Sequence, residues 1–226
     1  MKSAFFFYSL FVLTTLISTL GCESQIKKTV YSAYEKVGIY KRDILKDRIE
    51  DTKGSQEDAK EEFTSAYDKL KTLYNHDGGD LEAKFRKFSS SYDDAEKRAQ
   101  RVHTSIAKMD GVANDLFKEW QAEIQEISDS KLQMKSQAKL GQTQTVFRQL
   151  SSGLKRSEQK MVPVLQMFKD QTLYLKHNLN AQAIGALKKE SVNMESQMGS
   201  LMMDMNASIK DLEEFLIEME DKKTIP

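Results

Sequence analysis

A heptad repeat of apolar side chains constrains the fold of this chain more than any other feature of its sequence. From Leu81 to Trp120 the repeat advances by alternating steps of four and three residues without a break. A helix with an apolar stripe of this period supercoils around a partner helix in the left-handed sense. The stripe consists of Leu81, Phe85, Phe88, Tyr92, Ala95, Ala99, Val102, Ile106, Met109, Ala113, Leu116 and Trp120, and Ile124 and Ile127 extend it.

The preceding segment, residues 26–73, has the pattern of a partner helix. Its stripe shows a phase step near Ile44 and a polar patch at residues 50–58; its members are Ile26, Val30, Ala33, Val37, Tyr40, Leu45, Ile49, Thr52, Ala59, Phe63, Ala66, Leu70 and Leu73. Residues 75–80 read Asn-His-Asp-Gly-Gly-Asp, in which glycine can end one helix and Asp80 can cap the next. The two segments are therefore expected to form a helical hairpin.

Two more helical segments follow this hairpin. Residues 128–130, Ser-Asp-Ser, offer a cap for a third helix from about Lys131, which is expected to kink at Pro163 rather than stop there. Asn178-Leu179-Asn180 marks the third turn, although the apolar period can also be traced through it into one longer helix. The third stripe contains Val146 or Phe147, Leu150, Leu154, Met161, Leu165, Phe168, Thr172, Leu175 and Leu179, and the fourth contains Ile184, Leu187, Met194, Met198, Leu201, Met205, Ile209, Leu212, Leu216 and Met219.

The four segments together predict an all-α fold. Each segment has roughly 42 to 52 residues and would extend about 63 to 78 Å as a helix. Helices of similar length joined by short turns favour antiparallel packing. We therefore expect an elongated four-helix coiled-coil bundle with up-down-up-down topology. The alternative is two hairpins in line that share a continuous central helix.

The charge balance limits the classes of partner. The chain has 34 Lys and Arg against 34 Asp and Glu, and removal of residues 1–21 takes away only one base, Lys2. A chain so close to neutral has no global field that would attract DNA or RNA, so no nucleic acid is expected as a partner. Charged residues make up 30% of the sequence and there are only two prolines, which is typical of long solvated helices.

The N-terminus has the features of an export signal. One base, Lys2, precedes an apolar run that ends near Ile17, too short for a committed transmembrane helix. Residues 19–22 read Thr-Leu-Gly-Cys, with a small residue directly before the only cysteine, as in a bacterial lipobox. Residues 1–21 are predicted to be a lipoprotein signal peptide, followed by one helical domain over residues 22–226. The alternative is an ordinary signal peptide and a free thiol.

Acylation of Cys22 would hold the chain at a membrane. A diacylglycerol-type group on sulfur and a fatty acid such as palmitate on the amine give stable anchoring where a single chain would not. Glu23 follows the cysteine in place of aspartate. By the sorting rule of enterobacterial lipoproteins, this favours the inner leaflet of the outer membrane, with the helices in the periplasm.

Three stretches of the sequence also carry a family resemblance. Residues 31–45 read Tyr-Ser-Ala-Tyr-Glu-Lys-Val-Gly-Ile-Tyr-Lys-Arg-Asp-Ile-Leu, residues 77–82 read Asp-Gly-Gly-Asp-Leu-Glu, and residues 168–181 read Phe-Lys-Asp-Gln-Thr-Leu-Tyr-Leu-Lys-His-Asn-Leu-Asn-Ala. They resemble the bacterial lipoprotein family catalogued as domain of unknown function 2959, over essentially the whole mature chain. The resemblance implies the location and the helical shape, and it brings no catalytic residues with it.

No motif in the sequence names a reaction. The chain lacks the glycine-rich loops that bind phosphate and the GxSxG elbow of hydrolases. His76, His103 and His177 are not spaced to share one helix face, as a zinc site would need. The many carboxylates are expected to be solvated or ion-paired along the helices. We therefore expect no enzymatic activity, no cofactor and no metal.

One group of polar residues is a candidate interaction site. In an up-down bundle the first and third turns lie at the same end, which would bring His76 and Asp77 toward His177, Asn178 and Asn180. These five residues are predicted to form a site for a partner or ligand at the distal tip. The alternative is turn chemistry, in which the asparagine and aspartate side chains satisfy helix ends.

The last helical segment is rich in methionine, a residue that fills irregular cores and also forms adaptable binding faces. Core packing is the preferred interpretation, because most of these side chains lie on the apolar stripe. Met202 and Met203 do not follow it. The methionines of this segment include Met194, Met198, Met202, Met203, Met205 and Met219.

These observations lead to two hypotheses about function. The first is a non-catalytic structural or interaction module of the cell envelope, bound to the membrane through its lipid and contacting an envelope protein or peptidoglycan. The second is a periplasmic helical bundle that binds a ligand or metal. A polar-lined cavity would favour the second hypothesis, and a solid core with exposed apolar side chains would favour the first.

Overall fold

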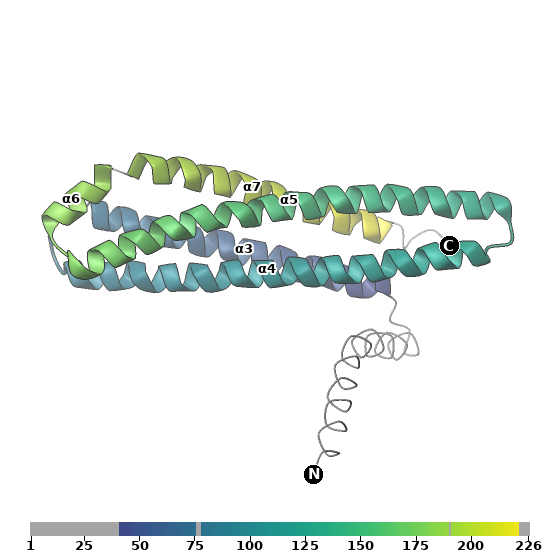
Figure 1. The fold of residues 1–226 in the computed structure, drawn as a ribbon, viewed down its shortest axis with the longest axis horizontal. Coiled ribbons are helices and arrows are strands. Elements are labelled where there is room, and N and C mark those ends of the chain that lie inside the picture. The colour runs from purple at the N-terminus through teal and green to yellow at the C-terminus, as the bar shows by residue number, and fades with distance from the viewer. Residues whose placement is uncertain (1–40, 76–77, 190, 222–226) are drawn as a thin grey trace, which may run out of the picture. The chain divides into compact units, whose positions relative to one another are not determined.

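The computed structural model describes residues 41–75, 78–189 and 191–221. The chain divides into two units, Met1–Ile44 and Leu45–Pro226, and only residues 41–44 of the first unit are described. The predicted signal peptide and Cys22 lie outside the described residues. The described residues form five helices: α3 (Lys41–Tyr74), α4 (Leu81–Glu126), α5 (Ser130–His177), α6 (Ala181–Lys189) and α7 (Ser191–Asp221) (Figure 1).

The long helices of the second unit alternate in direction and pack side by side (Figure 1). Helix α5 packs closely on both α4 and α7. Helix α3 contacts α7 through Lys53 Nζ, 2.8 Å from Glu213 Oε1, and contacts α5 through the rings of Phe63 and Phe168. These contacts confirm the up-down-up-down bundle and exclude two hairpins in line.

The turns follow the predicted local chemistry. Gly78 and Gly79 have φ angles of 129° and 88°, in the left-handed region that glycine tolerates best. Asp80 caps α4 by accepting a hydrogen bond from the backbone N–H of Ala83 at 2.9 Å. At the other end, Asp129 caps α5 by accepting from the N–H groups of Lys131 and Leu132. Both predicted caps are confirmed.

The two ends of the bundle contain different turns. The α6 end holds the turn between α3 and α4 and the short helix α6 (Figure 1). The hairpin end holds the turn at residues 127–129 between α4 and α5. Among the described residues, α4 and α5 extend past α3 and α7 at the hairpin end (Figure 1).

The heptad stripe of α4 is buried as predicted over most of its length, and its last part differs. Beyond Ala113, the buried residue is Phe117, whereas Leu116 and Trp120 are half-buried. The Phe117 ring packs edge-on against Phe147 of α5, with 5.6 Å between ring centroids. In this part of α4 the buried position next to α5 is Phe117, one residue later than predicted. The predicted positions that are fully buried are Phe88, Tyr92, Ala95, Val102, Ile106, Met109, Ala113 and Ile124.

The polar patch at residues 50–58 contributes to the seam, in which Thr52 was predicted and Gln56 was not. Thr52 and Gln56 are fully buried at heptad positions of α3, and Ser157 is fully buried on α5. The Ser157 hydroxyl donates to Gln56 Oε1 at 3.3 Å, and the Thr52 hydroxyl donates to a backbone carbonyl of its own helix. These hydrogen bonds satisfy the two hydroxyl groups and Gln56 Oε1, whereas Gln56 Nε2 is buried without a partner among the described residues. The seam therefore continues through polar side chains.

In α5 and α7 some buried positions also differ from the predicted stripes. The buried set of α5 follows a strict heptad through Ser157, Val164 and Gln171, so the predicted positions Leu165 and Thr172 are only half-buried. In α7, Ser208 and Phe215 are buried in place of the predicted Ile209 and Leu216. A prediction from apolar side chains alone is wrong by one residue where the buried position holds a polar residue, or where a second large apolar residue lies beside it.

The fourth predicted segment consists of two helices rather than one. Helix α5 ends at His177, α6 begins at Ala181, and α7 begins at Ser191. The predicted turn at residues 178–180 is confirmed, and the alternative of one longer helix is excluded. Helix α5 itself continues through Pro163 without a stop, as expected. None of the described helices has the length and apolar content that a membrane span requires.

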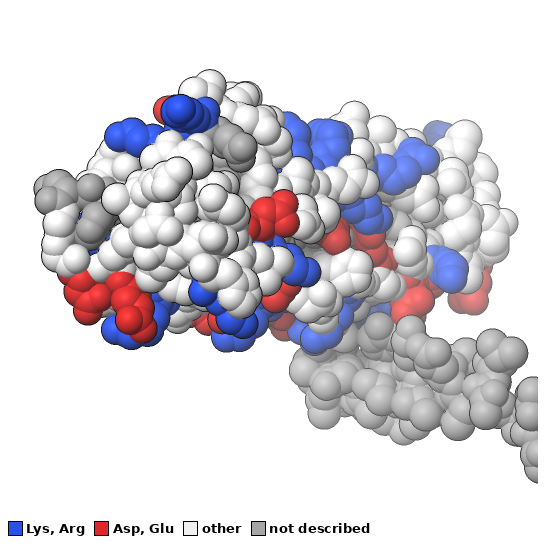
Figure 2. Space-filling view, turned by 60° about the vertical axis from the view of Figure 1, so that its left-hand side comes forward, with Lys and Arg blue, Asp and Glu red and all other residues white. Residues whose placement is uncertain are grey.

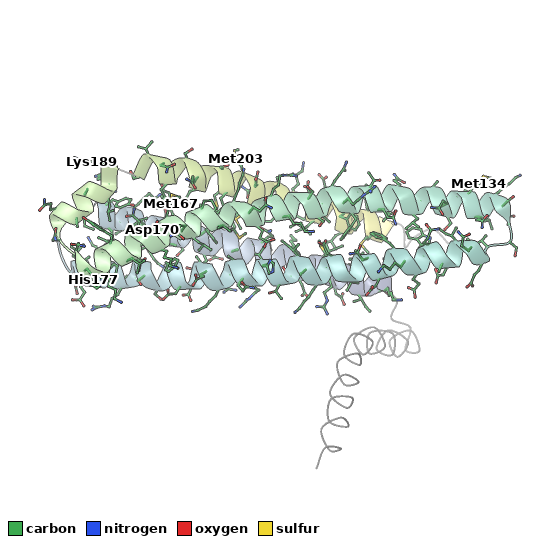
Figure 3. The ribbon with its side chains drawn as sticks, in the orientation of Figure 1. Met134, Met167, Asp170, His177, Lys189 and Met203 are labelled. Carbon is green, nitrogen blue, oxygen red and sulfur yellow. The ribbon has the colours of Figure 1, made fainter. Side chains whose placement is uncertain are left out.

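The methionines of α7 divide between core and surface. Met194, Met198 and Met205 are buried, which confirms core packing for these three. Met202 is half-buried and its sulfur accepts a weak hydrogen bond from the Thr64 hydroxyl at 3.5 Å. Met203 is 68% exposed on the outer face of α7 (Figure 3).

Candidate interaction surface at the α6 end

Helix α6 closes one end of the bundle. Its apolar side chains Ala183, Ile184 and Leu187 are buried, so this short helix is held by packing on its inner face. Lys188 Nζ donates a hydrogen bond to Asn75 Oδ1 at 2.8 Å, which links α6 to the residue that follows α3. The first and third turns therefore lie at the same end, as the predicted topology required.

Asn178 and Asn180 both serve the turn between α5 and α6. The backbone N–H of Asn178 donates to the carbonyls of Tyr174 and Leu175, and its side-chain amide donates to Tyr174 O at 3.1 Å. Asn180 Oδ1 accepts from the N–H of Ala183 at 3.0 Å, in the manner of an N-cap. The alternative interpretation, that these side chains satisfy helix ends, accounts for both asparagines.

The histidine of the predicted site has a different environment. His177 ends α5 at the α6 end and is exposed (Figure 3). Within the described residues, no hydrogen bond is formed by its ring. His76 and Asp77 lie outside the described residues. His177 is thus the one predicted tip residue whose side chain is described and is not used to build the turn.

The segment from His177 into α6 is free of charge. Residues 177–187 contain no Lys, Arg, Asp or Glu, although charged residues make up 30% of the chain. Figure 2 shows a broad uncharged area over this end of the bundle. Leu173 and Tyr174, in the last turn of α5, are 52% and 42% exposed. The surface offers apolar, aromatic, imidazole and amide groups, which suit a partner recognised by contact and hydrogen bonding rather than by charge.

A second feature, which the sequence interpretation missed, is an open groove along α4 and α5. Its volume is about 900 Å³, and Phe117 and Phe147 are among its lining residues. Asp110 accepts hydrogen bonds from Ser151 at 2.8 Å and from Lys155 at 2.6 Å on one side. The groove lies on the surface and not inside the core. Its other charged lining residues are all basic: Lys118, Arg148 and Arg156.

The remaining histidine joins the same pair of helices. His103 Nδ1 of α4 lies 2.6 Å from Glu158 Oε1 of α5. A single carboxylate is not enough for a metal site, and the described residues contain no group of three or more His, Cys, Asp or Glu side chains that could hold an ion. This contact tethers α4 to α5.

Comparison with known proteins places the chain in a family. No characterised protein and no solved structure matches it. A family profile matches residues 30–219, which include α3 to α6, nearly all of α7, and the two longer stretches on which the resemblance was based. The chain belongs to the family described as Protein of unknown function (DUF2959).

Proposed function

We propose that this chain is a non-catalytic structural or interaction module of the bacterial cell envelope, anchored to a membrane through Cys22. The observation that carries the proposal is the α6 end. There a packed helix and two capping asparagines hold an uncharged surface in place, with Leu173 and Tyr174 exposed beside it. A rigid surface of this composition is suited to docking.

The proposed anchor rests on the sequence of the N-terminus. Residues 19–22, Thr-Leu-Gly-Cys, follow an apolar export signal, and Glu23 follows the cysteine. In this proposal residues 1–21 are removed, residues 22–226 form the mature lipoprotein, and the protein resides at the outer membrane facing the periplasm. The partner at the α6 end is another envelope protein or peptidoglycan.

Two experiments test the proposal. Cys22→Ser should leave the protein unprocessed or release it from the membrane fraction, and unchanged detergent partitioning would contradict the anchor. For the tip, a photocrosslinking amino acid at position 177 should capture one specific envelope component in living cells. Position 128, which is also exposed but lies at the hairpin end, is the matched control. Equal capture at both positions, or none at position 177, would contradict docking at the α6 end.

The groove along α4 and α5 favours a second candidate, a periplasmic ligand-binding bundle. Arg148, Arg156 and Lys118 give it a basic lining, and its volume of about 900 Å³ is within the range of ligand sites. Native mass spectrometry of the protein purified from membranes should then show a bound acidic molecule that Arg148→Gln removes. A spectrum of unliganded protein alone would count against this candidate.

A further inference from the structure

The groove along α4 and α5 presents two cations, one from each helix. Among its described lining residues the one acid is Asp110, and Ser151 and Lys155 already bind its carboxylate at 2.8 and 2.6 Å. Lys118 and Arg148 are exposed in the same lining, and neither has a carboxylate oxygen within 4.0 Å among the residues that the structure describes. These two side chains are therefore available to an acidic partner.

The acids near the groove do not cancel this pair of cations. Two further acids in this part of α4, Asp115 and Glu119, do not line the groove. On the other side, residues 130–157 of α5 contain six bases and no acid. Arg156 is left out of the argument, because it and Asp211 of α7 approach the same glycine of α5.

The last part of α7 has the opposite character on its outer face. Ile217 is 57% exposed, and Glu213, Glu214 and Glu218 are exposed around it. Residues 210–223 contain six acids and three bases. An apolar side chain surrounded by acids complements a groove in which cations flank two phenylalanine rings.

The α7 helix of the same chain does not fill this groove. Helix α5 packs on both α4 and α7, and the buried ring of Phe215 lies 5.9 Å from the ring of Phe147. Ile217 follows Phe215 by two residues, which is about 200° around a helix of 3.6 residues per turn. Because Phe215 faces α5, Ile217 faces away from it. The exposed isoleucine and the acids beside it are therefore presented to another molecule.

We propose that the groove along α4 and α5 binds the last part of α7 from a second copy of this chain. Ile217 of the second copy lies over Phe117 and Phe147, and the glutamates beside it approach the two cations. This is recognition of a helix by a groove between two helices. The groove and the outer face of α7 are different surfaces, so the contact is heterologous and can repeat from copy to copy.

A second copy explains more of the surface than a small acidic molecule does. Both would use the cations of the groove, but only a second copy also covers the exposed Ile217. The inference goes beyond the proposed function, because it requires neither the lipid anchor nor docking at the α6 end. It competes with the acidic ligand of the second candidate for one groove, so the test must separate the two.

The test reverses the charges on each side of the contact in the full chain, purified from membranes in detergent. The groove variant is Lys118→Glu with Arg148→Glu, and the α7 variant is Glu214→Lys with Glu218→Lys. Ser128→Cys, at the exposed turn, carries a donor dye in one sample and an acceptor dye in another. Energy transfer between copies is then measured against protein concentration.

Each variant alone should self-associate about 100-fold more weakly than the chain without charge reversal, because like charges then face each other. A mixture of the groove variant and the α7 variant should recover the energy transfer, since the reversed groove of one again meets opposite charge on the other. Loss of folding in either variant could not produce this recovery.

The matched control is Lys169→Glu with Lys176→Glu, which makes the same charge change at exposed positions near the other end of α5 and should leave energy transfer unchanged. The proposal is wrong if the chain without charge reversal shows no transfer that rises with concentration, which would leave the groove to an acidic ligand. It is also wrong if the mixture transfers no more energy than the separate variants. An acylated Cys22 does not react with the dyes, so labelling of a chain without Ser128→Cys tests the anchor separately.

Discussion

The two ends of the bundle are stabilised in different ways. Near the α6 end, the rings of Phe63, Phe88 and Phe168 come from three helices and are fully buried, with 6.3 and 5.9 Å from Phe168 to the other two. At the hairpin end, the described contacts join α4 and α5 alone, through the buried side chains Ile124 and Leu140 and through polar pairs such as Trp120 with Ser136. The aromatic cluster couples three helices at once, whereas the contacts at the hairpin end couple two. The α6 end should therefore open only with the whole bundle, and the hairpin end can open locally.

The largest effect is expected for a substitution in the aromatic cluster near the α6 end. Phe168→Ala removes the ring that contacts both Phe63 and Phe88 and should lower the free energy of unfolding by about 3–5 kcal/mol. Denaturant titration followed by far-ultraviolet dichroism measures the change. Leu132→Ala, at the exposed hairpin position, serves as the control and should stay within about 0.5 kcal/mol. Equal losses in the free energy of unfolding for the two variants would contradict the difference in stability between the two ends.

A smaller effect is expected between the ends, at the buried polar pair. Ser157→Ala deletes the donor to Gln56 Oε1 and leaves a buried amide oxygen without that bond. The free energy of unfolding should fall by about 1–3 kcal/mol. Ser128→Ala, in the exposed turn, is the matched serine substitution and should have little effect. If Ser157→Ala is neutral, the polar positions do not hold the seam together.

The third prediction concerns the hairpin end itself. Asp129→Ala removes the cap of α5 and should cost about 1 kcal/mol. Because the cap is local, amide hydrogen exchange should accelerate in the first turns of α5 and remain unchanged around Phe168. Asp129→Asn can still accept the hydrogen bonds and should retain most of the protection. Faster exchange at both ends would show that the hairpin end does not open independently.

The smallest effect is electrostatic. The hydrogen bond to Glu213 holds the pKa of Lys53 above its ordinary value of 10.5. The interaction that raises the pKa stabilises the folded state while the lysine is charged. This contribution is lost as the pH rises through the pKa of the lysine in the folded state. Lys53→Gln should therefore lower Tm slightly at neutral pH and have no effect at strongly alkaline pH. A Tm difference that persists in alkali would assign the effect to packing and not to charge.

The sequence was sufficient for features that depend on local periodicity and turn chemistry. The stripe from Phe88 to Ala113 is buried as its period predicts, apart from the half-buried Ala99, because supercoiled helices bury a side chain at steps of three and four. Gly78 and Gly79 take left-handed angles, and Asp80 caps the next helix. The turn at residues 178–180 was also predictable, because asparagine serves helix ends well. The capping roles of both asparagines follow from that chemistry.

Other features depended on neighbours that are distant in the sequence. Gln56 was not recognised as a core residue because hydrophobicity alone marks burial in a sequence. Its burial depends on Ser157, 101 residues away, which supplies a hydrogen bond. The groove along α4 and α5 was missed for a similar reason. The absence of acids from residues 130–157 was visible in the sequence, but only the packing of the helices brings Lys118 alongside Arg148 and Arg156.

The sequence by itself determined the helices, their caps and the all-α class, because each depends on contacts within a few residues. The tertiary structure decided which polar residues enter the core, where the fourth segment divides into α6 and α7, and which side chains remain outside. Leu132 and Met134 have the composition of core residues and still face solvent. Burial requires a neighbouring helix on the correct side, and the described residues provide none over that face at the hairpin end.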